Sequence, residues 1–219
     1  MTISSYIDHT ILKPDCTITD IRKLCQEAVT HQFVAVCIPP YFIQSAVQIL
    51  RELGGKTKIA TVIGFPMGYS STPAKIEEIK RAIDDGADEV DAVVNICAIK
   101  NGHWNYVAND IDSMTTAAHI KGKRIKIILE TGLLNEEEIE HLAEILLKSK
   151  PDFAKTSTGF NGTGAELEKV LFLQKLLQNK VAIKASGGIR SLEMASAFIE
   201  AGASRIGTSS GIAIVKEAS

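Results

Sequence analysis

Charged side chains stand inside four short apolar segments of this sequence, where a strand buried on both faces would normally carry none. Successive side chains of a strand point to opposite faces, so the charged residues of each segment define one face. The apolar face suits a surrounding layer of helices, which leaves the charged face for the interior. The residues that this alternation places inside are Asp91, Lys126, Glu130, Lys155 and Lys184.

Two of these lysines, Lys155 and Lys184, fall on consecutive segments, and paired lysines have a chemical use. A lysine with an ordinary pKa of about 10.4 is almost entirely ammonium at neutral pH and does not attack a carbonyl. Burial and a second cation both lower that pKa, which produces a Schiff-base nucleophile. Asp91 would then take and return protons. Charge placement leaves open which lysine is the nucleophile, and a structural ion pair is the alternative for any one of these residues.

Two glycine-containing loops near the end of the sequence are candidate anion sites. ASGGI at 185–189 and GTSSG at 207–211 each follow an expected strand. Ordinary turn glycines and capping serines are the alternative for either loop alone. Together they favour a phosphate site, because the loops after strands seven and eight bind phosphate in many (β/α)8 barrels. The hydroxyls that would assist the backbone N–H groups are those of Ser186, Thr208, Ser209 and Ser210.

A scaffold that gathers these groups is indicated by eight strand-like segments, which recur roughly every 25–35 residues and alternate with helical patterns. The expected strands are 6–10, 33–38, 58–65, 89–96, 124–131, 153–158, 181–186 and 204–208. This alternation predicts an α/β fold, a single-domain TIM (β/α)8 barrel over residues 1–219, with its active site at the carboxyl ends of the strands. An open doubly wound sheet is the alternative, and no GxGxxG follows the first strand to support it.

Helix ends are marked by capping residues. The expected starts are Thr17 with Asp20, Thr72 before Pro73, Asn135 with Glu138, and Thr163 with Glu166. Each pairing places a side-chain acceptor, or a proline, where the first helical N–H groups lack partners. Gly86 and Gly202 are the expected stops before the next strand.

Composition and sequence patterns limit the binding partners and the cellular location that we expect. The net charge of -2 does not indicate a nucleic-acid or membrane-surface partner. The four cysteines form no CxxC pair and have no histidine cluster near them, so we expect no zinc site. We also expect no other metal and no cofactor. The start of the sequence lacks a signal-peptide pattern, and no apolar run approaches the ~18 residues of a membrane span. We therefore expect a cytoplasmic protein. Barrels of this kind often pair through helix faces, so a homodimer or higher homo-oligomer is the assembly that we consider.

Blocks along almost the whole chain resemble the deoxyribose-phosphate aldolase family. They are IDHT (7–10), VCIPP (36–40), IGFPMG (63–68), GADEVDAVVN (86–95), KIILETG (126–132), AKTSTGF (154–160), KASGGIR (184–190) and GTSSG (207–211). KTSTG and KASGG are the most specific of them. The resemblance implies a class I aldolase, working without a metal in deoxyribose phosphate catabolism. Its reaction would be the reversible cleavage of 2-deoxy-D-ribose 5-phosphate to D-glyceraldehyde 3-phosphate and acetaldehyde.

The resemblance also implies roles for individual residues. It makes Lys155 the Schiff-base lysine, Lys184 its assistant and Asp91 the proton relay. The remaining positions that it matches to substrate contacts or supports are Asp8, Thr10, Cys37, Lys126, Thr158, Gly187, Gly188, Ser209 and Ser210. Some family members end in a tail whose last residue is tyrosine, whereas this sequence ends IVKEAS. We therefore expect enamine protonation to rely on water and the lysine pair.

Two other functions fit part of the pattern. A sugar-phosphate isomerase on the same barrel would need the glycine loops but not two neighbouring lysines. A non-catalytic sugar-phosphate-binding barrel would bind its ligand without turnover. We expect no catalytic role for Cys37, and His9 should face away from Asp8 because adjacent side chains of a strand alternate.

Overall fold

Eight short strands pair in parallel in chain order, and the eighth pairs with the first to close a barrel. The computed structural model describes residues 2–218. The strands are β1 (Ile7–Thr10), β2 (Ala35–Ile38), β3 (Lys58–Ile63), β4 (Glu89–Val93), β5 (Arg124–Ile128), β6 (Phe153–Lys155), β7 (Ala182–Ser186) and β8 (Arg205–Thr208). The predicted single-domain TIM barrel is confirmed, and the doubly wound alternative is wrong.

Each expected strand is present but shorter than predicted. The segment expected at 153–158 is a strand only over its first three residues, Phe153–Lys155. Beyond them the chain leaves the barrel to form loops at its carboxyl end. Apolar and β-branched residues continue into these loops, and composition alone therefore overestimates the strands.

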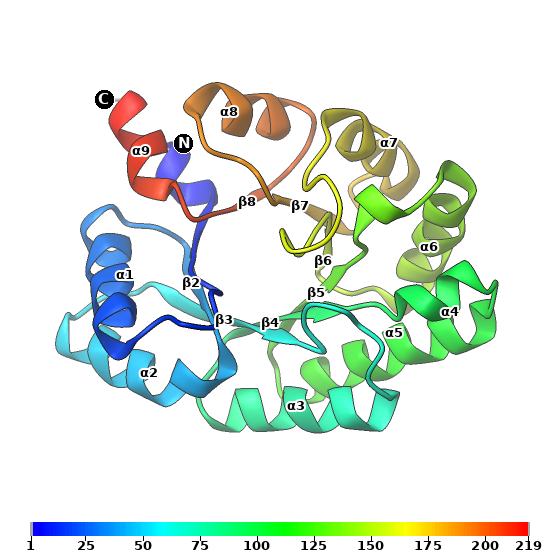
Figure 1. Cartoon of the computed structure of the whole chain (residues 1–219), viewed down its shortest axis with the longest axis horizontal. Coiled ribbons are helices and arrows are strands. Elements are labelled where there is room, and N and C mark those ends of the chain that lie inside the picture. The colour runs from blue at the N-terminus through cyan, green and yellow to red at the C-terminus, as the bar shows by residue number, and fades with distance from the viewer. Residues whose placement is uncertain (1, 219) are drawn as a thin grey trace.

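Helices surround the barrel, as Figure 1 shows, and the first and last described segments of the chain lie beside each other. The α-helices are α1 (Ile18–Thr30), α2 (Ile43–Glu52), α3 (Thr72–Asp84), α4 (Ile96–Lys100), α5 (Trp104–Ile120), α6 (Glu136–Ser149), α7 (Leu167–Leu177), α8 (Leu192–Glu200) and α9 (Gly211–Glu217). Short 3-10 turns η1 (Ile3–Tyr6), η2 (Pro40–Phe42) and η3 (Thr131–Leu133) complete the layer. No helix within residues 2–218 is long and apolar enough to cross a membrane.

Two of the predicted helix starts form full capping boxes. Thr17 with Asp20 begins α1, and Asn135 with Glu138 begins α6, each pair exchanging side-chain and backbone hydrogen bonds. At α3 the helix begins at Thr72 and its N-cap is Ser71, one residue earlier than expected.

The predicted helix start at Thr163 is wrong. The helix α7 begins at Leu167, and the Thr163 hydroxyl instead contacts the Glu166 carboxylate within the preceding loop. Gly162 and Gly164 have φ values of 65° and 84°, which a right-handed helix cannot include. The capping-box spacing therefore occurs here in a glycine-rich loop. The expected stops are confirmed, since Gly86 and Gly202 follow α3 and α8 with φ of 114° and 106°.

The barrel interior is divided between apolar and charged halves. Small apolar side chains of β2 and β3, Ala35, Cys37, Ala60 and Val62, form a patch of their own. The main core lies between the strands and the helices and consists mostly of aliphatic residues, to which every strand contributes. The other half of the interior belongs to β1 and β4–β8, each of which contributes at least one charged inward side chain.

Candidate active site

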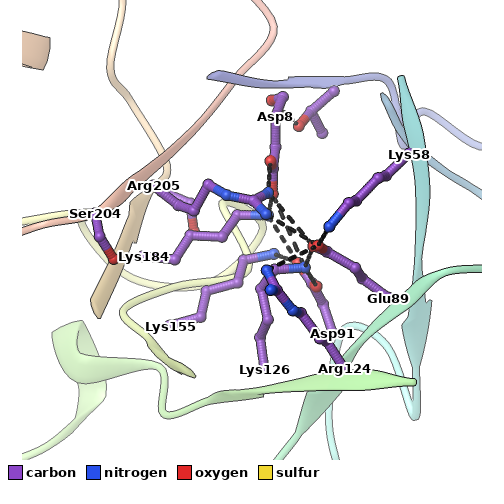
Figure 2. Close-up of polar contacts among 12 residues, drawn as sticks. Asp8, Lys58, Glu89, Asp91, Arg124, Lys126, Lys155, Lys184, Ser204 and Arg205 are labelled. Atoms are coloured by element: carbon purple, nitrogen blue, oxygen red, sulfur yellow. Dashed lines mark hydrogen bonds and ion pairs between the residues drawn. The ribbon is translucent and has the colours of Figure 1, made fainter. Parts of the chain in front are cut away.

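Seven ionisable side chains converge in the charged half of the barrel from β1 and β4–β8 (Figure 2). Each has 5% or less of its surface exposed. They are Asp8, Glu89, Asp91, Lys126, Lys155, Lys184 and Arg205. Alternation along β4 to β7 predicted four of the seven, Asp91 and the three lysines, and the structure brings those four into direct contact.

Asp91 lies at the centre of the lysines. Its Oδ2 accepts hydrogen bonds from Lys155 Nζ and Lys184 Nζ, each at 2.9 Å. Its Oδ1 accepts one from Lys126 Nζ at 2.7 Å. Burial by itself would raise the pKa of Asp91, but the three ammonium groups outweigh it and hold that pKa well below its usual range. Asp91 is therefore a carboxylate in the resting protein.

Lys184 is held between two carboxylates. Its Nζ lies 2.5 Å from Asp8 Oδ2 and 2.9 Å from Asp91 Oδ2. Burial opposes the charge, yet Asp8 and Asp91 together raise the pKa of Lys184 above its ordinary value. Lys184 therefore stays protonated, and its Nζ contacts the same oxygen, Asp91 Oδ2, as Lys155 Nζ.

Lys155 differs from Lys126 and Lys184, the other two interior lysines, because it lines a cavity. It lines a cavity of about 300 Å³ at the carboxyl ends of β1, β6, β7 and β8. Lys126 and Lys184 do not line this cavity. Lys126 lies beside Asp91 on the neighbouring strand, where it also contacts Glu89 Oε2 at 2.6 Å. A ligand in the cavity therefore meets the amine of Lys155.

Both predicted phosphate loops form a wall of the same cavity. Thr158, Gly187, Gly188 and Ser209 line it, together with Thr10. Gly187 has a φ of 94°, and a Cβ there would lie 3.0 Å from the Cα of Gly164. Only glycine allows this close approach of two loops. Ser210 does not line the cavity, and its backbone N–H donates to Thr208 Oγ1 at 2.8 Å.

Two cations at the cavity mouth were missed from the sequence. Lys13 and Arg190 line the cavity with exposed side chains, on the loops that follow β1 and β7. Arg190 is the last residue of the KASGGIR block, so its position beside the glycine loop was available as a signal.

Glu130 is buried but not on the strand that the sequence predicted. It follows β5 with a φ of 57°, in the left-handed region. Its carboxylate accepts the Thr158 backbone N–H at 3.1 Å and also contacts the Thr158 hydroxyl. Glu130 therefore fixes the loop after β6 rather than facing the lysines.

Three further predicted positions surround this centre. Asp8 contacts Lys184 and Arg205, and although burial acts to raise its pKa, nearby Lys184, Lys126 and Arg205 lower it to about 2. The Thr10 hydroxyl donates to the Asp8 carbonyl at 2.9 Å. Cys37 lies in the apolar patch, where burial raises the pKa of its thiol.

His9 faces outward, as predicted. Its Nε2 lies 2.8 Å from Glu27 Oε2 of α1, and burial lowers the pKa of the ring more than Glu27 raises it. His9 therefore belongs to the packing between β1 and α1.

Glu89 and Arg205 are interior residues that the sequence analysis did not select. Arg205 Nη2 lies 2.9 Å from Glu89 Oε1, and Arg205 Nη1 contacts Asp8. The alternation rule carried the signal, because Glu89 precedes Asp91 by two residues and so shares its face. Across residues 2–218, no group of three or more His, Cys, Asp or Glu side chains is arranged to hold a metal ion.

Comparison with known proteins agrees with this architecture. A family model described as DeoC/LacD family aldolase matches residues 2–217. A protein of Thermococcus gammatolerans named deoxyribose-phosphate aldolase is 48% identical over 218 residues, covering 100% of this chain and 97% of the relative. Among solved structures, an aldolase designated QR15 superposes with a TM-score of 0.91 at 39% identity, covering 98% of this chain and 95% of that one. A deoxyribose phosphate aldolase from Aeropyrum pernix, described as tetrameric, gives a TM-score of 0.90 at 30% identity, with 98% and 90% covered. This chain belongs to the DeoC/LacD family of aldolases.

Proposed function

We propose that this protein is a class I deoxyribose-phosphate aldolase that uses Lys155 as its Schiff-base nucleophile. The reaction is the reversible cleavage of 2-deoxy-D-ribose 5-phosphate to D-glyceraldehyde 3-phosphate and acetaldehyde. The observation that carries the proposal is the position of Lys155. It lines the cavity of the glycine loops while sharing Asp91 Oδ2 with Lys184.

The chemistry follows from these contacts. The neutral amine of Lys155 attacks C1 of the open-chain sugar, and loss of water gives an iminium that acts as an electron sink. Asp91, helped by Lys184 and ordered water, takes the proton of the C3 hydroxyl as the C3–C2 bond breaks. Glyceraldehyde 3-phosphate leaves first. The remaining enamine is protonated at C2, and hydrolysis of the resulting iminium releases acetaldehyde and restores Lys155.

The charges around Lys155 suit this sequence of steps. The low pKa of Asp91 makes it a weak base, so a proton that it accepts passes on at once to water or to the enamine. Asp91 is therefore suited to relay protons rather than to hold them.

The phosphate of the substrate would lie against the loops after β7 and β8. Gly187, Gly188 and Ser209 offer neutral donors, and Lys13 and Arg190 supply the positive charge that a phosphate dianion requires. Ser210 would contribute through the loop that it shares with Ser209 rather than from the cavity wall. In this proposal the phosphate would lie near the mouth and C1 near Lys155.

Trapping with borohydride tests the proposal. Reduction in the presence of acetaldehyde should add an ethyl group irreversibly at Lys155, as located by peptide mass spectrometry. The variant K155R keeps the positive charge but lacks a nucleophilic amine, so it should show neither the adduct nor cleavage. An adduct confined to Lys126, or cleavage that survives K155R, would refute the assignment of Lys155 as the nucleophile.

Assembly and location complete the proposal. We propose a homo-oligomer, which is supported by the Aeropyrum pernix relative described as tetrameric. Sedimentation equilibrium tests it, and a monomer at all concentrations would contradict it. A cytoplasmic location stays a prediction from composition.

A further inference from the structure

Six of the interior charges form a closed ring of ion pairs, in which each carboxylate lies between two cations (Figure 2). One side runs from Glu89 through Lys126 to Asp91, with contacts of 2.6 and 2.7 Å. The other side runs from Asp91 through Lys184 to Asp8, with contacts of 2.9 and 2.5 Å. Arg205 closes the ring, because it contacts Asp8 and lies 2.9 Å from Glu89 Oε1.

The ring is electrically neutral, and Lys155 is the cation left over. Three carboxylates alternate with Lys126, Lys184 and Arg205, whereas Lys155 is attached at Asp91 only. Burial would raise the pKa of Glu89, but Lys126 and Arg205 lower it overall, so Glu89 stays ionised. Burial would lower the pKa of Arg205, but Asp8 and Glu89 raise it. Among the interior cations, Lys155 can therefore lose its charge without leaving a ring carboxylate short of its two partners.

We propose that Glu89 and Arg205 are positioning residues of the aldolase reaction, which close this ring away from the cavity and so make Lys155 the interior amine that releases its proton. This inference rests on the proposed function of Lys155. Neither residue lines the cavity, so neither touches the substrate. Glu89 acts on Asp91 through Lys126, and Arg205 acts on Lys184 through Asp8.

The remaining groups around the pair do not substitute for it. Lys58 Nζ and Arg124 Nη1 lie 3.6 and 3.9 Å from Glu89 Oε1, but their side chains are 40% and 51% exposed, so water screens them. The Phe153 ring lies 5.5 Å from the Arg205 guanidinium and 5.9 Å from Lys126 Nζ. From β2, the one titratable group that affects the ring is the Cys37 thiol, whose pKa is raised by burial and which therefore stays neutral.

The test is the pH dependence of amine reactivity in three variants. Cyanoborohydride trapping of acetaldehyde at Lys155 is measured against pH, and the midpoint of the acidic limb is compared with the wild type. E89Q removes a negative charge, which disfavours the ammonium form of Lys155 and should move the midpoint down by about 1 pH unit. R205M removes a positive charge and should move it up by about the same amount. The double variant E89Q/R205M restores neutrality and should return the midpoint close to the wild-type value.

A buried ion pair elsewhere in the chain provides the matched control. Lys75 Nζ lies 2.8 Å from Asp110 Oδ2 between α3 and α5, and neither side chain exceeds 1% exposure. D110N should lower the urea midpoint of unfolding and leave the acidic limb in place. The conservative variants E89D and R205K keep the charges and should also keep the wild-type midpoint.

The outcomes separate the two proposals. A lower midpoint of the acidic limb in E89Q and a higher one in R205M support the positioning role. If one of the two variants does not fold, the shift in the other variant is sufficient to test the role. Unmoved midpoints, or midpoints that move in the same direction, overturn it while an adduct at Lys155 leaves the proposed function intact. Absence of the wild-type adduct at Lys155 would overturn the proposed function itself.

Discussion

Acid should weaken this barrel through Asp8, and the size of the effect follows from its contacts. Asp8 is fully buried between Lys184 and Arg205, and these cations, with Lys126, overcome the effect of burial and lower its pKa from 3.8 to about 2. A carboxyl group whose pKa is lower in the folded state contributes stability above its unfolded pKa and loses it as pH falls toward the folded value. At ~1.36 kcal/mol per pKa unit, the contribution is about 2 kcal/mol at pH 7 and about 1 kcal/mol at pH 3.

The variant D8N isolates this contribution. The free energy of unfolding is measured by urea titration at pH 7, 4 and 3 for the wild type and for D8N. The cost of D8N should fall by about 1 kcal/mol between pH 7 and pH 3, because the wild type alone loses the interaction. D112N, which removes an exposed carboxylate of α5, controls for the loss of one negative charge from the protein. A cost of D8N that is equal at pH 7 and pH 3 would refute the electrostatic account of Asp8.

Three further predictions concern the lysine pair, the phosphate loop and a helix cap. K184M removes the lasting cation beside Lys155, so kcat should fall by about 100-fold or more with a smaller change in KM; steady-state kinetics in which only KM changes would contradict this. G187A places a Cβ 3.0 Å from the Gly164 Cα at a φ of 94°, so the KM for deoxyribose 5-phosphate should rise more than kcat falls, and an unchanged KM would contradict a phosphate site here. N135A removes the capping box of α6 and should lower the free energy of unfolding by about 1 kcal/mol in urea, with activity unchanged at 25 °C.

The sequence predicts the fold well because the fold depends on local patterns. Strand and helix periods, with caps such as Thr17 and Asn135, specify which element forms where and in which order. Parallel strands with short crossovers then leave few topologies to choose from. The errors arise where loops imitate these patterns, as at Thr163, or where a strand-like segment such as 153–158 leaves the barrel early.

The sequence predicted which face of its strand each charged side chain of the site occupies, but not which residues that side chain contacts. Alternation placed Asp91, Lys126, Lys155 and Lys184 on inward faces, yet it left the two lysines of the pair interchangeable. Their difference depends on the cavity and on the second carboxylate that Lys184 contacts, and both require three dimensions. Lys75 illustrates the same limit, because a lysine in a charged helix such as α3 gives no sign of its burial against Asp110.

The closing contacts of the ring join the two ends of the chain. Asp8 meets Lys184 across 176 residues and Arg205 across 197 residues of sequence. Contacts of such long range form late, because the intervening chain must be ordered before they can be made. A folding intermediate that lacks β8 would therefore carry Asp8 and Glu89 without Arg205, inside a barrel that is still open to water. Water can solvate those charges until the last strand seals the barrel, so barrel closure and the completion of the ion-pair ring by Arg205 become a single event in folding.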